Sequence, residues 1–395
     1  MNVLLSDRVQ RIKPSPTLAV TARAAELRAA GQDIIGLGAG EPDFDTPEHI
    51  KQAAIKAIQD GFTKYTAVDG TAGLKKAIIN KFARDNGLEY RPDQILVSCG
   101  GKQSFYNLAQ ALLNPGDEVI IPAPYWVSYP DMVLLADATP VILPAPQEQG
   151  FKLTPGQLES AITARTRLVV INSPSNPSGV AYTRRELEAL GEVLRRHPQV
   201  MIATDDMYEH ILWSAEPFCN ILNACPDLYD RTIVLNGVSK AYSMTGWRIG
   251  YAGGPAPLIK AMKNVQSQST SNPTSISQVA AQAALEGDQS CIQDMLAAFK
   301  ERHDFVVAGL NEIDGIECLP SDGTFYSLPR VQRVIERLDD INDDVELAEY
   351  LITKAQVALV PGSAFGAPGH LRLSFATSMA KLSEALNRIK DALAG

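Results

Sequence analysis

With 395 residues, the chain is longer than a single hydrophobic core usually supports, and this length predicts two domains. Its 45% hydrophobic and 21% charged residues are typical of a globular protein rather than a disordered or fibrous one. The formal net charge of −9 argues against a nucleic-acid-binding protein, and the chain has no run of about 18 apolar residues that would predict a membrane span.

The cysteines and the first residues indicate where the protein is expected to work. The five cysteines are odd in number and scattered, so they match neither a disulfide framework nor the spacing of metal ligands. The first residues contain no apolar segment of signal-peptide length. We therefore expect a cytoplasmic protein without a bound metal, a membrane partner or a nucleic-acid partner.

The N-terminal region predicts an arm, a helix and a glycine-containing loop. Residues 1–15 are polar and contain prolines, and residues 17–30 have a strong helical pattern that Gly31 ends. The glycines of residues 34–44 suggest a dinucleotide-binding fingerprint, but the third glycine comes one position early and Pro42 blocks the helix that should follow. We therefore expect no dinucleotide site, which argues against a nicotinamide-dependent dehydrogenase.

From residue 48 onward, the pattern predicts helices over 48–59 and 72–86, followed by alternating strands and helices. Apolar runs typical of buried strands occur at 95–97, 119–121, 141–143, 168–171, 200–203 and 233–235, and helical periodicity occurs at 103–113 and 184–195. This alternation predicts an α/β fold with a mostly parallel sheet covered on both faces. Ligands bind beyond the carboxyl ends of such strands, so the residues that follow them are the candidates for a site.

The last of these strands leads into residues 235–251, which contain one lysine among small residues between two β-like runs. Burial in such a loop disfavours the charged form of Lys240 and lowers its pKa, and a neutral amine can form a Schiff base with an aldehyde. Arg248, eight positions later, offers planar donors to a phosphate. The alternative is an ordinary lysine on a surface turn.

Three other strand ends carry groups suited to a charged ligand. Gly100 and Gly101 open a helix, where exposed N–H groups and the helix dipole attract an anion, although an ordinary turn has the same pattern. Asn176 lies in a turn with repeated prolines, from which its amide can face a ligand. Asp205 directly follows a buried strand, where it is either a helix N-cap or a carboxylate of the site, and Tyr208 follows it.

After residue 290 the pattern predicts a smaller α+β unit. We expect helices over 292–312, 346–355 and 380–393, a weak strand over 316–319 and a strand over 357–360. Residues 369–376 alternate strictly, which places Arg372 on the face opposite Leu371, Leu373 and Phe375. A lone arginine on a strand is usually part of a salt bridge at the rim of a sheet.

Ser239-Lys240 followed by residues 244–251 (Met-Thr-Gly-Trp-Arg-Ile-Gly-Tyr) resembles the pyridoxal-phosphate attachment motif of the class I aminotransferases, in particular the bacterial aspartate aminotransferase branch. The resemblance runs through nearly the whole chain. It implies fold type I of the pyridoxal-phosphate enzymes, with a mostly parallel central sheet in a large domain and a smaller α+β domain. The implied division is an arm over 1–15, a large cofactor-binding domain over 48–290 and a small domain formed by 16–47 and 291–395.

The resemblance also implies the residues of the site and a homodimer. The implied catalytic residues are Lys240, Asp205 and Tyr208. The implied contacts of pyridoxal 5′-phosphate are Lys240, Asp205, Tyr208, Asn176, Arg248, Trp126, Gly101, Lys102, Ser239, Tyr65 and Ser271. The implied contacts of the substrate are Gly40, Trp126, Asn176, Arg372 and Lys102. In related enzymes the tyrosine that matches Tyr65 reaches the cofactor phosphate of the other subunit, and the segment around Ser271 lies at the dimer interface near that phosphate.

By the same resemblance, each site residue has an expected role. Asp205 would pair with the protonated pyridine nitrogen, and Trp126 would stack on the pyridine ring, although an aromatic beside a strand end is usually part of the core. Tyr208 and Asn176 would tune the phenolic oxygen. The phosphate would be held by Arg248 and the turn over residues 100–102. Arg372 would clamp the substrate α-carboxylate with its two-pronged guanidinium.

The chain departs from the family pattern at two positions. Animal-type aspartate aminotransferases carry an arginine for the distal carboxylate four residues before the position of Ser271, where this chain has Ser267. Lys102 is the candidate replacement, with a solvated lysine at a helix start as the alternative, and Lys13 beside the arm is a further candidate contact. Gly237 stands where many relatives have a phosphate-binding serine, a role that Ser239 or backbone groups would take over.

Together these features predict a transaminase that moves an amino group between L-aspartate or glutamate and 2-oxoglutarate or oxaloacetate by a ping-pong mechanism. A prephenate or aromatic amino acid aminotransferase is the first alternative. A lyase or decarboxylase with the same cofactor is a more distant alternative, because the fold does not determine the reaction. A non-catalytic regulatory domain is disfavoured because Lys240 and Arg372 are both present and no DNA-binding module precedes the fold.

Overall fold

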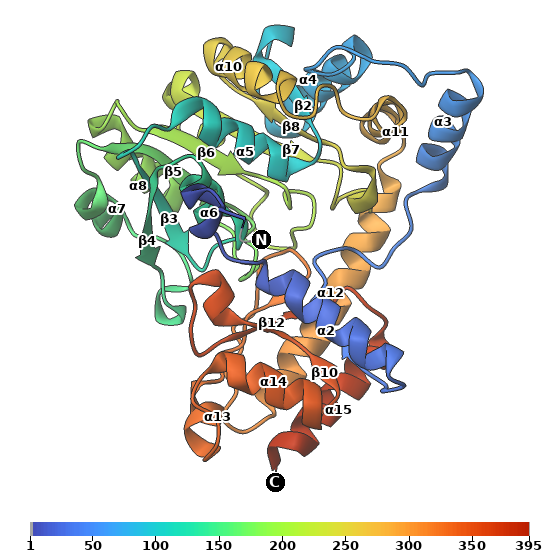
Figure 1. Cartoon of the computed structure of the whole chain (residues 1–395), viewed down its shortest axis with the longest axis vertical. Coiled ribbons are helices and arrows are strands. Elements are labelled where there is room, and N and C mark those ends of the chain that lie inside the picture. The colour runs from blue at the N-terminus through green and yellow to red at the C-terminus, as the bar shows by residue number, and fades with distance from the viewer. Residues whose placement is uncertain (1–2, 395) are drawn as a thin grey trace.

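The computed structural model describes residues 3–394 and is organised around a seven-stranded sheet (Figure 1). Its strands, in spatial order, are β2 (Ile95–Ser98), β8 (Gly250–Gly253), β7 (Thr232–Gly237), β6 (Met201–Asp205), β5 (Thr166–Asn172), β3 (Glu118–Ala123) and β4 (Thr139–Pro144). Neighbouring strands are parallel except at β8, which runs antiparallel to β2 and β7. The predicted mostly parallel α/β sheet is confirmed, and each predicted apolar run falls on one of these strands.

Helices cover both faces of this sheet. One face packs against α5 (Gly101–Leu112), α6 (Ser128–Leu135) and α10 (Ala256–Ser267). The core on the other face includes side chains of α3 (Glu48–Gln59), α4 (Ala72–Asn86), α7 (Pro155–Ala161), α8 (Arg184–Arg196) and α11 (Ser275–Glu286). Leu168 and Val170 of β5 point into the first core, whereas Val169 and Ile171 point into the second. This two-residue period is that of a strand buried on both faces.

The predicted bounds of the helices over 48–59 and 72–86 are confirmed, although Pro47 and not Thr46 is the N-cap of the first of them. The Thr71 hydroxyl accepts the N–H of Leu74 at the start of α4, and Gly87 ends that helix with φ 63°. In the N-terminal region, α2 (Pro16–Ala29) is followed by Gly31 with φ 87°, a left-handed conformation that glycine adopts easily. Two shorter helices are α1 (Asp7–Gln10), which precedes α2, and α9 (Ile221–Ala224), which lies between β6 and β7.

A second, smaller core combines residues from both ends of the chain. Its antiparallel sheet has the order β11 (Val360–Pro361), β12 (Leu371–Ser374) and β9 (Tyr326–Ser327), and β1 (Ile35–Gly36) pairs in parallel with β10 (Val357–Ala358). The accompanying helices are α12 (Ser290–Asn311), α13 (Gln332–Arg337), α14 (Asp344–Lys354) and α15 (Met379–Ala394). Figure 1 shows this unit below the large sheet, with α2 lying across it. The exact domain bounds stay a prediction.

The region around β12 confirms one expectation and corrects another. Leu371 and Leu373 enter the second core, and Arg372 points to the opposite side, as the alternation predicts. Residues 357–360, however, form two strands instead of one. The chain changes partner at Leu359, because β10 pairs with β1 and β11 pairs with β12.

The predicted strand over residues 316–319 is wrong. Only Glu317 forms an isolated bridge, to Arg330. The Asn311 side chain forms hydrogen bonds with both backbone groups of Cys318. It accepts from the N–H and donates to the carbonyl oxygen, at 2.9 Å each. A side chain that satisfies the backbone locally leaves no groups for a strand ladder, which explains the difference.

A buried ion pair ties α4 to the turn after β6. Lys81 is 1% exposed, contacts Glu209 and donates to the Asn86 side chain at 2.7 Å. The amides of Asn86 and Asn236 donate to Glu209 at 2.6 and 2.7 Å. Burial by itself raises the pKa of Glu209, but the charge of Lys81 and these hydrogen bonds outweigh it, so the pKa lies below its ordinary value. These contacts therefore fix the turn between β6 and Glu209 to α4 and β7.

None of the helices within residues 3–394 has the length and apolar character needed to cross a membrane.

Replacing Lys81 is expected to destabilise the fold strongly. Lys81→Met keeps the side-chain length but leaves Glu209 charged and buried, and such a change costs about 3–5 kcal/mol of unfolding free energy. Urea denaturation measures the loss. Lys76→Met, on the exposed face of the same helix, is the control and should change little. Equal urea midpoints for Lys81→Met and Lys76→Met would contradict the conclusion that the Lys81–Glu209 ion pair stabilises the fold.

Candidate active site

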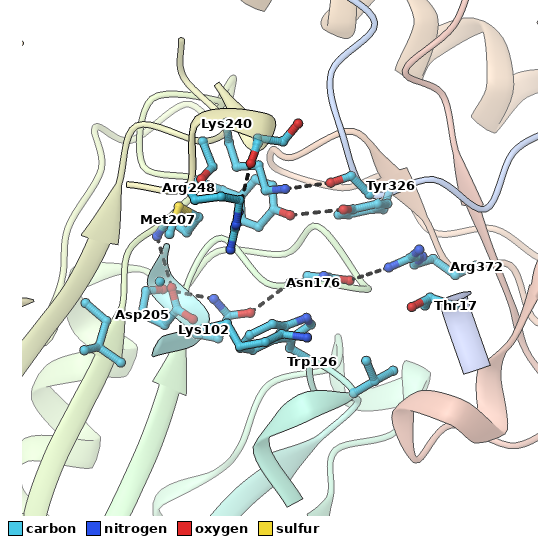
Figure 2. A pocket seen from close by; sticks show the side chains of 18 residues that line it. Thr17, Lys102, Trp126, Asn176, Asp205, Met207, Lys240, Arg248, Tyr326 and Arg372 are labelled. Carbon is cyan, nitrogen blue, oxygen red and sulfur yellow. Dashed lines mark hydrogen bonds between the residues drawn. The ribbon is translucent and has the colours of Figure 1, made fainter. Parts of the chain in front are cut away.

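The carboxyl ends of β5, β6 and β7 and the start of α5 border a cavity of about 240 Å³, and residues of the smaller unit line its other side (Figure 2). The predicted site residues that line it are Gly40, Gly101, Lys102, Trp126, Asn176, Asp205, Tyr208, Ser239, Lys240, Arg248 and Arg372. The expectation that strand ends gather these side chains at one place is confirmed.

Lys240 lies in the loop between β7 and β8, as the sequence predicts. Its Nζ donates to the carbonyl oxygen of Gly40 at 2.6 Å. Burial, together with the charges of Arg248 and Arg372, lowers the pKa of Lys240 to about 8, although the charges of Glu41 and Asp205 oppose this shift. A substantial fraction of this amine is therefore neutral near pH 8, the state in which an amine is a nucleophile.

Asp205 is the last residue of β6, and its half-buried side chain lies at the cavity wall. Residues 207–210 form turns, so Asp205 does not cap a helix and that alternative is wrong. The carboxylate accepts from the backbone N–H of Met207 at 3.3 Å and from the hydroxyl of Tyr129. Burial raises the pKa of Asp205. A half-buried carboxylate in such a place is suited to a ligand group that carries a proton.

Arg372 reaches the cavity from β12 and is 2% exposed. Its Nη1 donates to Asn176 Oδ1 at 3.0 Å and its Nη2 donates to the carbonyl oxygen of Gly38 at 2.7 Å, while its buried Nε has no partner among the described residues. The interpretation of Arg372 as a rim salt bridge is therefore wrong. Its partners are neutral, so its positive charge remains available to an anionic ligand.

Two aromatic rings enclose the Arg372 guanidinium. Its Cζ lies 4.4 Å from the ring centre of Tyr326 and 4.8 Å from that of Phe365. The Tyr326 hydroxyl lies 3.1 Å from the hydroxyl of Tyr208. Figure 2 shows Tyr326 between Arg372 and Lys240. Aromatic faces attract a cation without neutralising it, so this sandwich orients the guanidinium and preserves its charge.

The start of α5 and Arg248 form an anion cradle. Gly100, the N-cap of α5, has φ 85°, and a Cβ on it would collide with the Arg248 guanidinium. Arg248 itself adopts φ 56° and donates to the carbonyl oxygen of Thr245 at 2.8 Å and to that of Cys99 at 3.3 Å. The first N–H groups of a helix beside a guanidinium are suited to a phosphate.

Lys102 and Ser239 lie at the edges of this cradle. Lys102 Nζ is 5.3 Å from the Trp126 ring centre, and burial lowers the pKa of Lys102, as does the charge of Arg248. Lys102 therefore faces the cavity, as predicted. Ser239 also lines the cavity, whereas a Cβ at Gly237 would lie 3.1 Å from the backbone of residues 249–250, which leaves little room for a serine there.

Three residues considered from the sequence lie outside the cavity wall. Tyr65, between α3 and α4, is 92% exposed. Ser271 follows α10 with φ 63°, and its N–H bonds to the carbonyl oxygen of Gln266. The backbone N–H of Lys13 donates to Asp131 at 3.4 Å. The roles of Tyr65 and Ser271 require a second subunit and stay predictions.

Sequence reasoning missed several residues that line the cavity, among them Thr17, Asn172, Met207 and Tyr326. Asn172 ends β5 beside Asn176, and its side chain donates to the backbone carbonyl of Asp205 at 2.9 Å and accepts from the Asn176 N–H at 2.9 Å. Its place at a strand end could have identified it. Thr17 and Tyr326 come from elements outside the large sheet, so the strand-end rule could not find them.

Among residues 3–394, no group of three or more His, Cys, Asp or Glu side chains is placed to hold a metal ion.

Comparisons with known proteins identify the family. The family model "Aminotransferase class I and II" matches residues 32–389. The chain is 64% identical to the aspartate/prephenate aminotransferase of Nitrosomonas europaea over 394 residues, which cover 98% of this chain and 99% of that protein.

Solved structures show the same relationship. The crystal structure of the aspartate aminotransferase from Rhizobium meliloti matches with a TM-score of 0.96 and 51% identity, covering 100% of this chain and 99% of that one. The Thermus thermophilus aspartate aminotransferase with maleate matches with a TM-score of 0.93 and 43% identity, covering 99% of this chain and 100% of that one. The predicted resemblance is confirmed, and the chain belongs to the class I and II aminotransferase family.

Proposed function

We propose that this protein is a pyridoxal-phosphate-dependent transaminase that moves the amino group between L-aspartate or L-glutamate and 2-oxoglutarate or oxaloacetate. One observation carries the proposal: a single cavity holds the partly neutral amine of Lys240, the half-buried carboxylate of Asp205 and the guanidinium of Arg372, which has no carboxylate partner among the described residues. The names of the relatives support the aspartate assignment.

The residues present fit pyridoxal 5′-phosphate. Lys240 supplies an amine for the aldehyde, Asp205 a carboxylate for the ring nitrogen, and Trp126 a flat face for the ring. The turn at the start of α5 and Arg248 supply donors for the phosphate. A Cβ at Gly101 would lie 2.6 Å from Met207 Cε, so a larger residue there would displace the Met207 side chain at this wall of the cavity. When bound, this cofactor supplies an electron sink for the negative charge that develops at the substrate Cα.

The chain's own residues divide the remaining work. Lys240 Nζ would hold the cofactor covalently until the substrate amine takes its place there, and the amine thus released would move the proton at the substrate Cα, first as a base and then as an acid. Asp205 holds the proton on the ring nitrogen, and Tyr208 and Asn176 hydrogen-bond the phenolic oxygen. Arg372 binds the α-carboxylate and orients the Cα–H bond toward Lys240.

One site of this kind suits a ping-pong reaction. An amino acid and a 2-oxo acid both carry a carboxylate beside the reacting carbon, so Arg372 can bind the substrate of either half-reaction. The first product leaves before the second substrate enters the same place. No second substrate site is required for this scheme.

Lys102 is the proposed partner of the distal carboxylate. Ser267, at the end of α10, is outside the cavity wall, and its hydroxyl donates to the carbonyl oxygen of Asn264 at 2.7 Å. Lys102 Nζ lies over Trp126 inside the cavity, without a carboxylate partner among the described residues. A second carboxylate on the substrate can therefore pair with Lys102. The relative from Nitrosomonas europaea is also named for prephenate, so prephenate amination is the second candidate activity.

We also propose a homodimer in which Tyr65 reaches the cofactor phosphate of the other subunit. Tyr65 is 92% exposed, and it follows a helix whose exposed side carries Ile55 and Ile58, with Phe62 just beyond its end. A large tyrosine and neighbouring apolar side chains on one segment are typical of a surface that another chain covers.

The reactivity of Lys240 is expected to follow its lowered pKa. Burial favours the neutral amine, so in cofactor-free protein its acetylation by acetic anhydride should reach half of its maximal rate near pH 8 and then level off. Peptide mass spectrometry at a series of pH values measures this, with exposed Lys260 as the reference lysine. Glu41→Gln removes a charge that raises this pKa and should move the midpoint lower. A midpoint near the ordinary lysine value of about 10.4 would contradict the burial argument.

The substrate assignment predicts a selective effect of Lys102→Ala. The first half-reaction is followed by the loss of absorbance of the lysine-bound cofactor with aspartate, glutamate, alanine, phenylalanine and arogenate. Wild type should react fastest with aspartate and glutamate. Lys102→Ala should lower kcat/KM for these two by roughly 10- to 100-fold, the value of a hydrogen bond between charged groups, and leave alanine nearly unchanged.

Lys260→Ala, on the exposed side of α10, is the matched control and should behave as wild type. If arogenate reacts fastest, the chain is chiefly a prephenate aminotransferase. If Lys102→Ala instead weakens cofactor binding and slows the reaction equally with every substrate, Lys102 is a phosphate ligand. If no amino acid converts the cofactor, the transaminase proposal is wrong.

The dimer proposal predicts rescue in mixed dimers. Tyr65→Ala and Lys240→Ala are each expected to lose most activity as homodimers. In a hybrid of the two variants, one site combines the native Lys240 of one subunit with the native Tyr65 of the other. Hybrids purified by two affinity tags should therefore regain about half of the wild-type activity. If the hybrid is as inactive as the two homodimers, Tyr65 acts in the site of its own subunit or in neither site.

A further inference from the structure

Tyr326 contacts both the substrate side and the cofactor side of the cavity. It lies in β9, and its side chain is buried between the smaller unit and the turn after β6 (Figure 2). Its ring faces Arg372, and its hydroxyl faces Tyr208. The sequence resemblance assigns no role to this residue, although it touches two residues to which roles are assigned.

The ring of Tyr326 fixes the plane of the guanidinium. Arg372 Cζ lies 4.4 Å from this ring centre and 4.8 Å from the ring centre of Phe365. Asn176 and Gly38 hold two of the guanidinium nitrogens in that plane. The Arg372 guanidinium is thus oriented before any carboxylate binds, which reduces the entropy cost of ordering it when substrate binds.

The hydroxyl of Tyr326 has little freedom. It lies 3.1 Å from the Tyr208 hydroxyl, and a Cβ at Gly40 would lie 3.0 Å from it, so the Gly40 backbone closes its other side. The carbonyl oxygen of Gly40 is the one that accepts from Lys240. The Tyr326 hydroxyl is therefore next to Tyr208 and to Gly40, and Gly40 in turn binds Lys240.

Proton counting decides the direction of the hydrogen bond between the two tyrosines. Each hydroxyl has one proton to donate. If Tyr208 donates its proton to the phenolic oxygen of the cofactor, as proposed, it can only accept from Tyr326. A hydroxyl that accepts one hydrogen bond becomes a stronger donor in the next, so Tyr326 strengthens the contact that Tyr208 makes.

We propose that Tyr326 is a positioning residue with two separable roles: its ring holds Arg372 for the substrate carboxylate, and its hydroxyl directs the Tyr208 proton toward the cofactor. This inference rests on the proposed transaminase function. The two roles reside on different atoms of one side chain, so Tyr326→Phe removes the second role alone and Tyr326→Leu removes both.

The hydroxyl role has a spectroscopic signature. Tyr208 draws negative charge from the phenolic oxygen, and that charge holds the proton on the neighbouring nitrogen contributed by Lys240. A weaker Tyr208 hydrogen bond therefore raises the pH midpoint of the absorbance change of the bound cofactor. For Tyr326→Phe we expect a rise of about 0.1–0.6 pH unit, roughly 10–30% of the effect of a whole hydrogen bond to a charged oxygen. In a Tyr208→Phe background, Tyr326→Phe should add no further shift, because it acts through Tyr208.

The role of the Tyr326 ring in holding Arg372 is measured by KM for aspartate. Tyr326→Phe keeps the aromatic face, so KM for aspartate should stay within about 2-fold of wild type. Tyr326→Leu should raise KM about 5- to 30-fold, the value of a desolvated cation–π contact. Phe365→Leu is the matched control, expected to raise KM without moving the pH midpoint. Thermal unfolding of each cofactor-free variant identifies any that fails to fold.

The outcomes distinguish this inference from the function on which it rests. The two-role assignment would be overturned by an unchanged pH midpoint in Tyr326→Phe, or by equal KM increases in Tyr326→Phe and Tyr326→Leu. In both cases aspartate would still react with the bound cofactor of the wild-type protein. A wild-type protein that forms no lysine-bound cofactor, or does not convert with any amino acid, would instead overturn the proposed function.

Discussion

The guanidinium of Arg372 is the charge around which the two parts of this protein meet. Removing such a charge from water costs several kcal/mol unless it is stabilised, and no carboxylate among the described residues does so. The side-chain oxygen of Asn176, the carbonyl oxygen of Gly38 and two aromatic rings stabilise it instead. These partners come from distant parts of the chain, so the charge is placed only when the large sheet and the smaller unit are both folded.

The same desolvation acts in opposite directions on the pKa values of two other charged groups of the cavity, Lys240 and Asp205. It lowers the pKa of Lys240 to about 8 and raises the pKa of Asp205, so both groups move toward their neutral forms. Lys102 and Arg248 add further positive charge at the start of α5. The cavity wall therefore has more cationic than anionic side chains, an arrangement that favours ligands with several negative groups.

Much of this site could be predicted from the sequence, because parallel strands end at one edge. Asn176, Asp205 and Lys240 each follow a buried apolar run, and alternation of strands with helices is enough to bring them together. The helix over 48–59 was equally predictable from its apolar spacing. Tyr326 was not, because nothing in a two-residue strand reveals that it pairs with β12. The split at Leu359 also depends on distant partners.

Membership of the family leaves the substrate open, and the position of Lys102 bears on it. Lys102 lies in the first turn of α5, where the helix dipole disfavours a cation, and burial and Arg248 lower its pKa further. A bound anion beside Lys102 offsets these effects, and the phosphate proposed for the start of α5 does so in part with every substrate. A substrate with a second carboxylate adds another anion beside Lys102, whereas alanine does not. Dicarboxylic substrates therefore offset more of the electrostatic cost of placing Lys102 there than alanine does, which gives a physical basis for preferring aspartate and glutamate.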